Sequence, residues 1–254
     1  MEPARHLEIL RREGDRLASV PVDALDAPVP TMEGWTVERV LRHTGKVHQW
    51  AAAFLDAGAD GLMAGADAPG IPHGPDCIPA YRESLDAVLA RFADLDPATP
   101  AATFTGSATV SWWMRRQAQE VSVHRVDAQD GVHAAGGSAP EDLAVDGAAD
   151  GIDEWATFFL PRWSDISGPV PADLFGRSVH IHGTDEPAPA DGAEWFITLG
   201  KEIEVHATHA KGDGALKGQA SDLLLHMWRR LPIADLDVVG DAIVAERLLD
   251  VVRL

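Results

Sequence analysis

A single cysteine, Cys77, is present in the chain of 254 residues, so neither an internal disulfide nor a paired-cysteine zinc site is available. A lone thiol is most simply read as a small, partly buried apolar residue, and it fits a reducing compartment. Residues 1–20 are charged throughout and lack the apolar core of a signal peptide. No segment approaches the roughly 20 apolar residues of a membrane span. We therefore expect a cytoplasmic protein that does not enter a membrane.

Positive charge is also scarce. The sequence has 21 Lys and Arg against 40 Asp and Glu, for a formal net charge of -19. Nucleic acids and anionic membrane surfaces both favour clustered Lys and Arg, so neither is an expected partner. A hydrophobic content of 46% is ordinary for a soluble globular chain, and a small-molecule partner fits better. Nothing in the pattern specifies an oligomeric state.

Several catalytic motifs are missing. The sequence contains no GxxxxGK[ST] phosphate loop, no GxGxxG after an expected strand, no GxSxG nucleophile elbow and no HExxH zinc helix. Nucleotide-dependent chemistry and the commonest hydrolase arrangements are therefore not indicated.

The N-terminal part shows helical periodicity in its apolar residues. We expect helices over residues 4–20, 36–56, 78–95, 108–129 and 141–160. Segments rich in Pro and Gly separate them and cannot extend a helix. Helices joined in this way predict an antiparallel bundle.

The pattern changes near residue 165. Alternating segments predict antiparallel strands in a meander over 177–185, 193–200 and 201–210. A strand then runs into a helix over 215–231, with Ser221 as the expected cap, and a last strand and helix follow from 236. The fold class expected is α+β, with a helical domain at 1–165 and a smaller domain with a mainly antiparallel sheet at 166–254.

Glu120 and His124 lie four residues apart, so a helix brings them to one point. Spacing alone favours a pair of solvated neighbours. His43, on another expected helix and among apolar residues, supplies a possible third group, and two histidines with one carboxylate would leave a coordination position open on a zinc ion. Asp127 either orients a ligand or is a solvated acid.

Other histidines compete for these roles. His48 points about 140° away from His43 on the same helix, so we place it at the surface or behind the ligands. His180 and His182 share one face of an expected strand, and His206 could join them, whereas His209 should face the opposite side. No carboxylate completes this second set by spacing, so an ordinary polar surface is the preferred interpretation.

Two helical segments, GWTVERVLRHTGKVHQWA (34–51) and WWMRRQAQEVSVHRVDAQ (112–129), resemble the signature helices of the mycothiol-dependent maleylpyruvate isomerase family. The tail, with GQASDLLLHMWRRL and LDVVGDAIVAERLL, is similar to the C-terminal domain of that family. The resemblance covers almost the whole chain. It implies a DinB-like four-helix bundle followed by a domain similar to sterol-carrier folds.

The resemblance also implies a site and an activity. A divalent metal, usually zinc, would be held by His43, Glu120 and His124, and an arginine of the C-terminal domain would lie near it; Arg230 is the expected one and Arg229 the alternative. A low-molecular-weight thiol, mycothiol, would attack a small electrophile as a thiolate, giving cis–trans isomerisation or thiol transfer.

A protein without catalytic activity is the rival interpretation. The bundle could be a metal-stabilised regulator, or the C-terminal domain a carrier for an apolar ligand. A zinc anti-sigma factor normally needs HxxxCxxC, which a chain with only Cys77 cannot supply.

Overall fold

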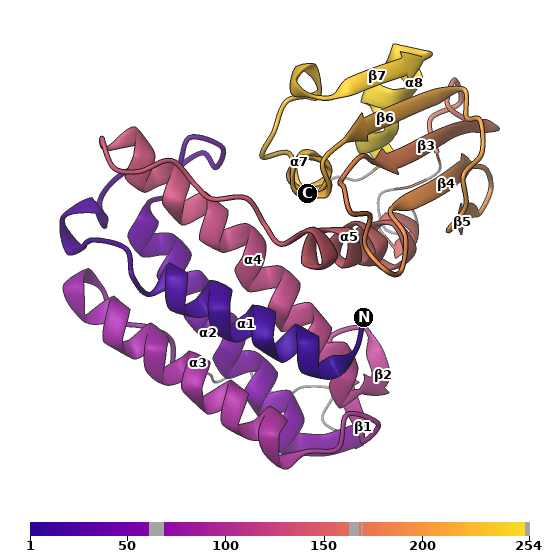
Figure 1. Ribbon diagram of the computed structural model, residues 1–254. Helices are drawn as coiled ribbons and strands as arrows, with labels where there is room; N and C mark the ends of the chain where they lie inside the picture. The colour runs from indigo at the N-terminus through magenta and orange to yellow at the C-terminus, as the bar shows by residue number, and fades with distance from the viewer. Residues whose placement is uncertain (61–68, 163–167, 169, 252–254) are drawn as a thin grey trace. The chain divides into compact units, whose positions relative to one another are not determined.

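The computed structural model describes residues 1–60, 69–162, 168 and 170–251, and it divides into two compact units, Met1–Glu141 and Asp142–Leu254 (Figure 1). The first unit is helical and the second combines helices with a five-stranded sheet. The expected α+β class is confirmed. None of the helices in the described residues is long and apolar enough to cross a membrane.

Four long helices form the first unit: α1 (Pro3–Leu17), α2 (Val37–Ala57), α3 (Cys77–Asp94) and α4 (Val110–Ala134). Pro3 begins α1, where its missing N–H costs no hydrogen bond, and the Thr36 side chain caps α2 by accepting from the Arg39 N–H. The α1 helix packs on α3 and α4, and α2 packs on α3 and α4. The bundle expected from periodicity is therefore present, with the four helices that the family resemblance implied, and it places α2 directly against α4.

A short hairpin, β1 (Pro100–Thr103) and β2 (Gly106–Thr109), precedes α4. The buried Trp113 indole donates to the Ala102 carbonyl oxygen at 2.9 Å and so fastens the hairpin to α4. Trp50 and Phe54 of α2 pack edge-on or tilted against the same indole. This aromatic cluster fixes one end of the α2–α4 pair.

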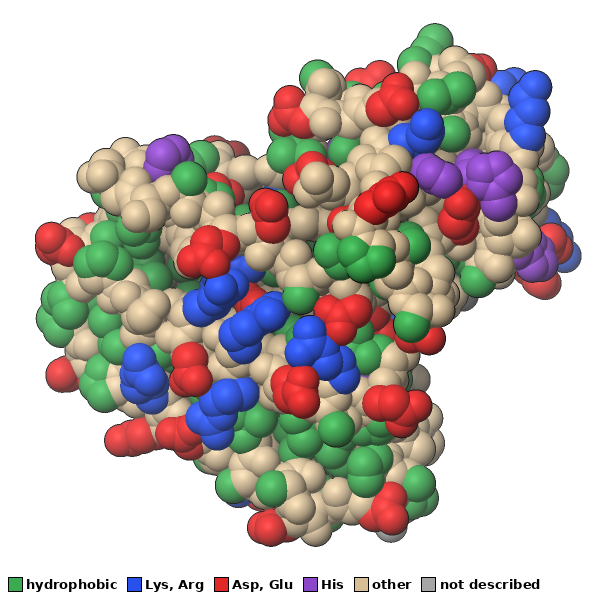
Figure 2. Space-filling view, in the orientation of Figure 1, with side chains coloured by type: hydrophobic (Ala, Val, Ile, Leu, Met, Phe, Trp, Pro, Cys, Tyr) green, Lys and Arg blue, Asp and Glu red, His purple; other side chains and the backbone are tan. Residues whose placement is uncertain are grey.

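Acidic and basic side chains are interspersed on one face of the helical unit (Figure 2). Exposed pairs such as Arg11–Asp86 and Arg16–Glu141 belong to this surface. One pair is different, because Glu13 of α1 and Arg125 of α4 have no exposed side-chain surface and meet at 2.6 Å. That buried pair joins the first helix to the helix that carries Glu120 and His124.

The second unit is built on a sheet with the strand order β5-β4-β3-β6-β7 (Figure 1). The strands are β3 (Arg177–Gly183), β4 (Glu194–Leu199), β5 (Ile203–His206), β6 (Gly214–Gly218) and β7 (Asp237–Gly240). The expected meander holds for β3, β4 and β5, but β6 pairs with β3 in parallel. The chain must therefore cross from the β5 edge over to the far side of β3.

Helices cover one face of this sheet. The α7 helix (Ala220–Met227) and the α8 helix (Ala242–Arg247) contact β3 and β6, on the side where Val179, Ile181 and Leu216 are buried. The expected capping role of Ser221 is wrong, because Gln219 precedes the helix and the buried Ser221 hydroxyl instead accepts from the Leu143 N–H at 3.0 Å.

The division between the units falls earlier in the chain than the expected one between residues 165 and 166. The α5 helix (Val145–Glu154) and the π-helical turn η4 (Trp155–Phe159) continue the helical periodicity of the first part. However, α5 packs on α7, and Asp153 accepts a hydrogen bond from the Trp195 indole of β4 at 3.2 Å. Residues 163–167, which include the expected boundary, lie outside the described residues.

Candidate metal centre

Three side chains from two helices converge in the first unit. His43 comes from α2, and Glu120 and His124 come from α4, one helical turn apart. Glu120 Oε1 lies 3.1 Å from His43 Nε2 and 3.3 Å from His124 Nε2, and the two imidazole centroids are 4.8 Å apart. One ligand atom from each of the three residues falls within 4.8 Å of the others. The structure thus brings together the three residues expected as ligands.

The Trp35 indole covers this cluster. It stacks on His124 at an interplanar angle of 9° and meets the His43 ring edge-on at a centroid distance of 5.1 Å. The Arg39 guanidinium lies 4.6 Å from the indole centroid on the same tryptophan. Sequence reasoning did not mark Trp35 as a site residue. The position of Trp35 in the sequence could have indicated this contact, because a large apolar residue just before the N-cap Thr36 folds back on its own helix.

The Glu120 carboxylate is ionised in this setting. Burial alone would raise its pKa, but hydrogen bonds from His124 and His43, with the charge of Arg116, hold the pKa well below its usual range. Arg116 donates to the other carboxylate oxygen, Oε2, at 3.0 Å. One oxygen therefore faces the two imidazoles and the other is anchored by an arginine on the same helix.

His124 has a second carboxylate partner, Asp127, whose side chain is fully buried. The distance from His124 Nδ1 to Asp127 Oδ2 is 2.8 Å. Burial acts to lower the pKa of His124, but Asp127 and Glu120 outweigh it and raise the pKa to about 9. A carboxylate on Nδ1 leaves Nε2 as the nitrogen that faces Glu120 and His43. This is the arrangement in which a carboxylate orients a metal-binding histidine.

His48 is buried, which excludes the surface position and leaves the other expected place, behind the expected ligands. Its Nδ1 lies 2.7 Å from Gln117 Oε1, and its ring lies 5.6 Å from that of Tyr81 on α3. Burial lowers the pKa of His48 to about 4, so the imidazole is neutral at physiological pH. Its place is in the packing between α2, α3 and α4.

The donor set of the first unit fits a zinc-like ion. Two imidazole nitrogens and one carboxylate oxygen are ligands that zinc accepts, and three protein ligands leave one position open. The oriented His124 ring and the anchored Glu120 carboxylate preset two of the three ligands. Cys77 does not contribute, because it is buried at the start of α3 and burial raises the pKa of its thiol to about 11.

Arg229 and Arg230 both follow α7 in the second unit. The Arg229 guanidinium donates to the Leu249 carbonyl oxygen at 2.5 Å, and Arg229 adopts a positive φ of 61°. The Arg230 guanidinium donates to the Trp228 carbonyl oxygen at 2.6 Å and is half-buried. A role for either arginine beside the metal stays a prediction.

The second histidine set also differs from expectation. His180 and His182 do share a face of β3, but the third histidine beside them is His209, not His206. Glu194 of β4 is the carboxylate that the spacing did not reveal. The rule that residues three apart on a strand face opposite sides fails here because β5 ends at His206.

Comparisons with known proteins follow the division of the chain. A model of the mycothiol maleylpyruvate isomerase N-terminal domain matches residues 7–129, and a model of the MDMPI C-terminal domain matches residues 142–247. No curated protein matches the chain.

Two solved structures share the fold. One is a histidine-to-alanine mutant of the mycothiol-dependent maleylpyruvate isomerase, with a TM-score of 0.59 and 14% identity over 94% of this chain and 93% of that chain. The other is a structure of the mycothiol-dependent maleylpyruvate isomerase, with a TM-score of 0.55 and 14% identity over 89% and 88% of the two chains. Since the two family models together span most of its length, the chain belongs to the mycothiol-dependent maleylpyruvate isomerase family.

Proposed function

We propose that the protein is an enzyme that uses a divalent metal, zinc in the first instance, to activate a low-molecular-weight thiol against a small electrophile. The observation that carries the proposal is the convergence of His43, Glu120 and His124 as a three-ligand set with one coordination position to spare. Membership of the family supports mycothiol as the thiol. The similar solved structures are described as those of a mycothiol-dependent maleylpyruvate isomerase, which supports isomerisation of a conjugated cis acid.

The metal, when bound, would lower the pKa of a thiol at the open position, so that the thiolate becomes available at neutral pH. The residues of the chain have separate tasks. Glu120 and the two histidines would hold the ion. Asp127 accepts the Nδ1–H of His124 and so leaves Nε2 for the metal, and Arg116 fixes the Glu120 carboxylate by a hydrogen bond. Trp35 covers the histidine rings and limits the access of water on that side.

Isomerisation would consume no reagent, because the thiolate that adds to the substrate is released again. The thiolate adds to one carbon of the conjugated cis double bond, and the electrons of that bond move onto the adjoining carbonyl. Rotation about the new single bond and loss of the thiolate restore the double bond in the trans form. Arg230 is the expected partner of a substrate carboxylate or of the developing enolate charge, and Arg229 is the alternative. With a substrate that carries a leaving group, the same thiolate would give a stable thioether instead.

Turnover tests the proposal directly. The zinc-loaded protein is mixed with mycothiol and maleylpyruvate, then with a panel of other electrophiles, and products are identified by chromatography and mass spectrometry. A trans isomer of unchanged mass indicates isomerisation, whereas a mass increased by the thiol indicates transfer. We expect His124→Ala and Glu120→Gln to lose the zinc ion of this centre and at least about 100-fold in kcat/KM. His133→Ala, an exposed histidine on the same helix, should retain both.

Two outcomes would overturn the proposal. One is full metal occupancy in both His43→Ala and His124→Ala, which would show that these residues are not the ligands. The other is the absence of product with every electrophile in the panel while the metal is bound. Tight binding of an apolar ligand in that second case would favour the carrier interpretation.

A further inference from the structure

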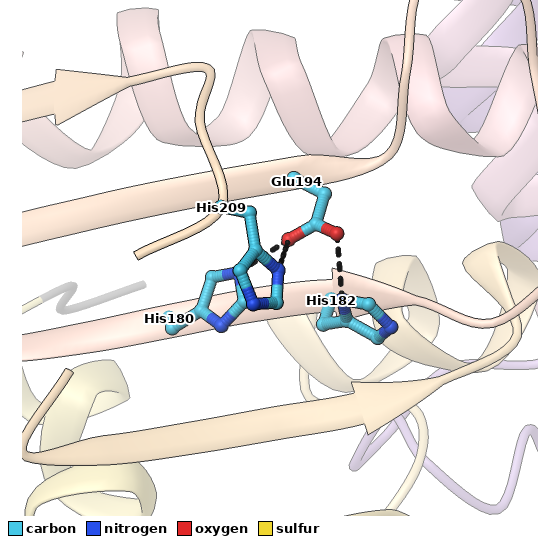
Figure 3. Close-up of side chains that lie close together, drawn as sticks. All are labelled: His180, His182, Glu194 and His209. Carbon is cyan, nitrogen blue, oxygen red and sulfur yellow. Dashed lines mark hydrogen bonds and ion pairs between the residues drawn. The ribbon is translucent and has the colours of Figure 1, made fainter. Parts of the chain in front are cut away.

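A second cluster of metal-binding side chains lies in the second unit (Figure 3). His180 and His182 project from β3, Glu194 projects from β4, and His209 reaches them from the connection after β5. The ring centroid of His209 lies 4.9 Å from that of His180 and 5.7 Å from that of His182. One ligand atom from each of the four residues falls within 4.8 Å of the others. None of these residues belongs to the candidate centre of the first unit.

Sheet register explains why three of the four meet. His182 is directly opposite Glu194 in the antiparallel pairing of β3 and β4. His180 lies two residues before His182 and so faces the same side. The neighbouring residues Val179 and Ile181 are buried on the other face, under the helices. The cluster therefore occupies the sheet face opposite the core.

The topology supplies the fourth residue. Because β5 is at one edge of the sheet and β6 pairs with β3, residues 207–213 must cross β4 and β3 to reach β6. His209 lies within this crossing. The crossing is held close at its end, where the Asp213 N–H donates to the Ser178 carbonyl oxygen at 3.0 Å. A side chain on Gly212 would come within 3.0 Å of the His180 backbone nitrogen, so only glycine fits there.

All three imidazoles approach the same carboxylate. Glu194 Oε2 lies 2.5 Å from His180 Nε2 and 2.9 Å from His209 Nδ1, while Oε1 lies 2.8 Å from His182 Nδ1 (Figure 3). His182 Nδ1 is buried and, despite that short distance, makes no hydrogen bond of good geometry with the described residues. The contact of this nitrogen with Glu194 is thus at ion-pair distance but lacks good hydrogen-bond geometry. A metal ion would satisfy this nitrogen, because it accepts a lone pair rather than a proton.

We propose that His180, His182, Glu194 and His209 form a second divalent-metal site, which takes a transition ion such as zinc and fastens the 207–213 crossing to the sheet. Three imidazoles and one carboxylate match zinc and its neighbours in the first transition series, whereas calcium and magnesium require oxygen ligands. Four protein ligands fill a tetrahedral shell, which is the arrangement of a structural site. The function of this ion is therefore to order the connection, and it does not depend on the proposed enzymatic activity.

Only small movements are needed to close the ligand shell. Zinc bonded at about 2.0–2.1 Å to each of four atoms would space them about 3.3 Å apart. The most distant ligand atoms in the cluster are within 4.8 Å, so they must approach by roughly 1.5 Å or less. His209 can provide this movement, since its side chain is 73% exposed and lies on a connection between strands. His180, only 7% exposed, is the fixed member.

Ordinary surface histidines in the same unit look different. His206 lies at the end of β5, 60% exposed, and its only ion-pair distance among the described residues is 3.8 Å, to Glu204. Purple histidine side chains gather at the surface of this unit in the space-filling view (Figure 2). His206 is therefore a matched control, a histidine of the same sheet outside the ligand set.

Zinc stoichiometry of the full chain tests the site. The protein is stripped with a chelator and titrated calorimetrically with zinc, and bound metal is then measured by atomic spectrometry after desalting. We expect two equivalents for the unaltered chain and one for His209→Ala or Glu194→Gln. His206→Ala should still bind two, and titration with magnesium should give no heat of specific binding. Retention of two equivalents in both cluster variants would overturn the proposal.

The double variant His43→Ala/His124→Ala isolates the second site. It should bind one zinc, and adding His209→Ala should weaken that binding at least about tenfold. Circular dichroism before titration checks that each variant is folded. Zinc binding that is unchanged by His209→Ala would contradict the assignment even if the ion proved to be present.

A second measurement reports the structural role. Lys211 is exposed in the crossing, two residues after His209, and is a trypsin site. In the double variant, zinc should slow trypsin cleavage after Lys211 several-fold, and His209→Ala should abolish this protection. Equal cleavage rates with and without zinc would show that the ion does not fasten the crossing.

Discussion

Asp127 orients the His124 imidazole. The carboxylate is buried one turn beyond the histidine and lies 2.8 Å from its Nδ1, so the ring is held with Nε2 toward Glu120 and His43. The i,i+3 spacing on a helix made this contact possible, but the sequence left a solvated acid as an equal alternative. Burial settles the choice, because a fully buried carboxylate requires a partner.

Asp127→Asn should weaken zinc binding to the first unit about 10- to 100-fold, the usual effect of removing a carboxylate that orients a histidine ligand. The amide keeps the size of the side chain but loses the charge that favours the Nδ1 proton. Competition with a fluorescent zinc chelator would measure the change. Asp130→Asn, on the same helix outside the ligand set, is the control. Equal affinities for the two variants would contradict the orienting role.

His48 makes folding sensitive to acid. Burial lowers its folded-state pKa from 6.5 to about 4, so between these values the unfolded chain binds a proton that the folded chain does not. Stability from this residue is therefore fully present above about pH 6.5 and is lost as pH falls toward 4. A difference of about 2.5 pKa units corresponds to roughly 3 kcal/mol.

His48→Asn removes this titration and keeps a donor for Gln117. Urea unfolding of both proteins at several values between pH 7 and pH 4 would give the comparison. We expect the unaltered protein to lose up to about 3 kcal/mol relative to His48→Asn over that range. Parallel stability curves for the two proteins would mean that His48 is not held neutral by burial.

At the scale of the elements, the contact between α1 and α4 contains the buried Glu13–Arg125 pair. Arg125 also donates to Gln129 at 2.8 Å and to the Glu141 carbonyl oxygen. Burial lowers the pKa of Arg125, and Glu13 opposes that effect. Because each charge has lost its water, the pair matters most when one member is removed.

Glu13→Gln should lower the free energy of unfolding by about 3–5 kcal/mol, since it leaves the Arg125 charge buried without its counter-ion. Asp86→Asn is the control, because it breaks the exposed Arg11–Asp86 pair and should cost no more than about 1 kcal/mol. Urea unfolding at neutral pH would measure both. Similar losses in the two variants would contradict the distinction between buried and exposed pairs.

Periodicity predicted helices and strands well, because it is a local property. The four bundle helices and the β3–β5 meander lie close to their expected ranges. The i,i+4 spacing of Glu120 and His124 is local in the same sense, and this is why two of the three residues of the first cluster could be identified from helix spacing. The parallel partnership of β3 and β6 is not local, so no strand pattern revealed it.

The misplaced residues share one physical cause. A residue that points away from one helix neighbour is not necessarily exposed, and His48, turned away from His43, meets Tyr81 of α3 instead. The division between the compact units likewise lies before the expected boundary, because α5 continues the helical periodicity but packs on α7. Glu194 and His209 came together through sheet register and a crossing connection. Neither the register nor the crossing can be read from the spacing of these residues in the sequence.

At the scale of the whole molecule, the chain combines two proposed metal sites of different kinds. The first has three protein ligands and an open position, and the second has four protein ligands. An acidic chain with a net charge of -19 favours divalent cations in general, so metal content alone does not distinguish specific sites from loose binding. The response to a thiol does distinguish them.

Cobalt can replace zinc and makes this difference visible. Addition of a low-molecular-weight thiol to the cobalt-loaded protein should produce a thiolate-to-cobalt charge-transfer band, because only the open site has a position for sulfur. His43→Ala/His124→Ala should abolish the band, whereas His209→Ala should leave its intensity per bound cobalt in the first site unchanged. A band that survives the double variant would place the thiol-binding metal in the second unit and would contradict the assignment of His43, Glu120 and His124 as the open site.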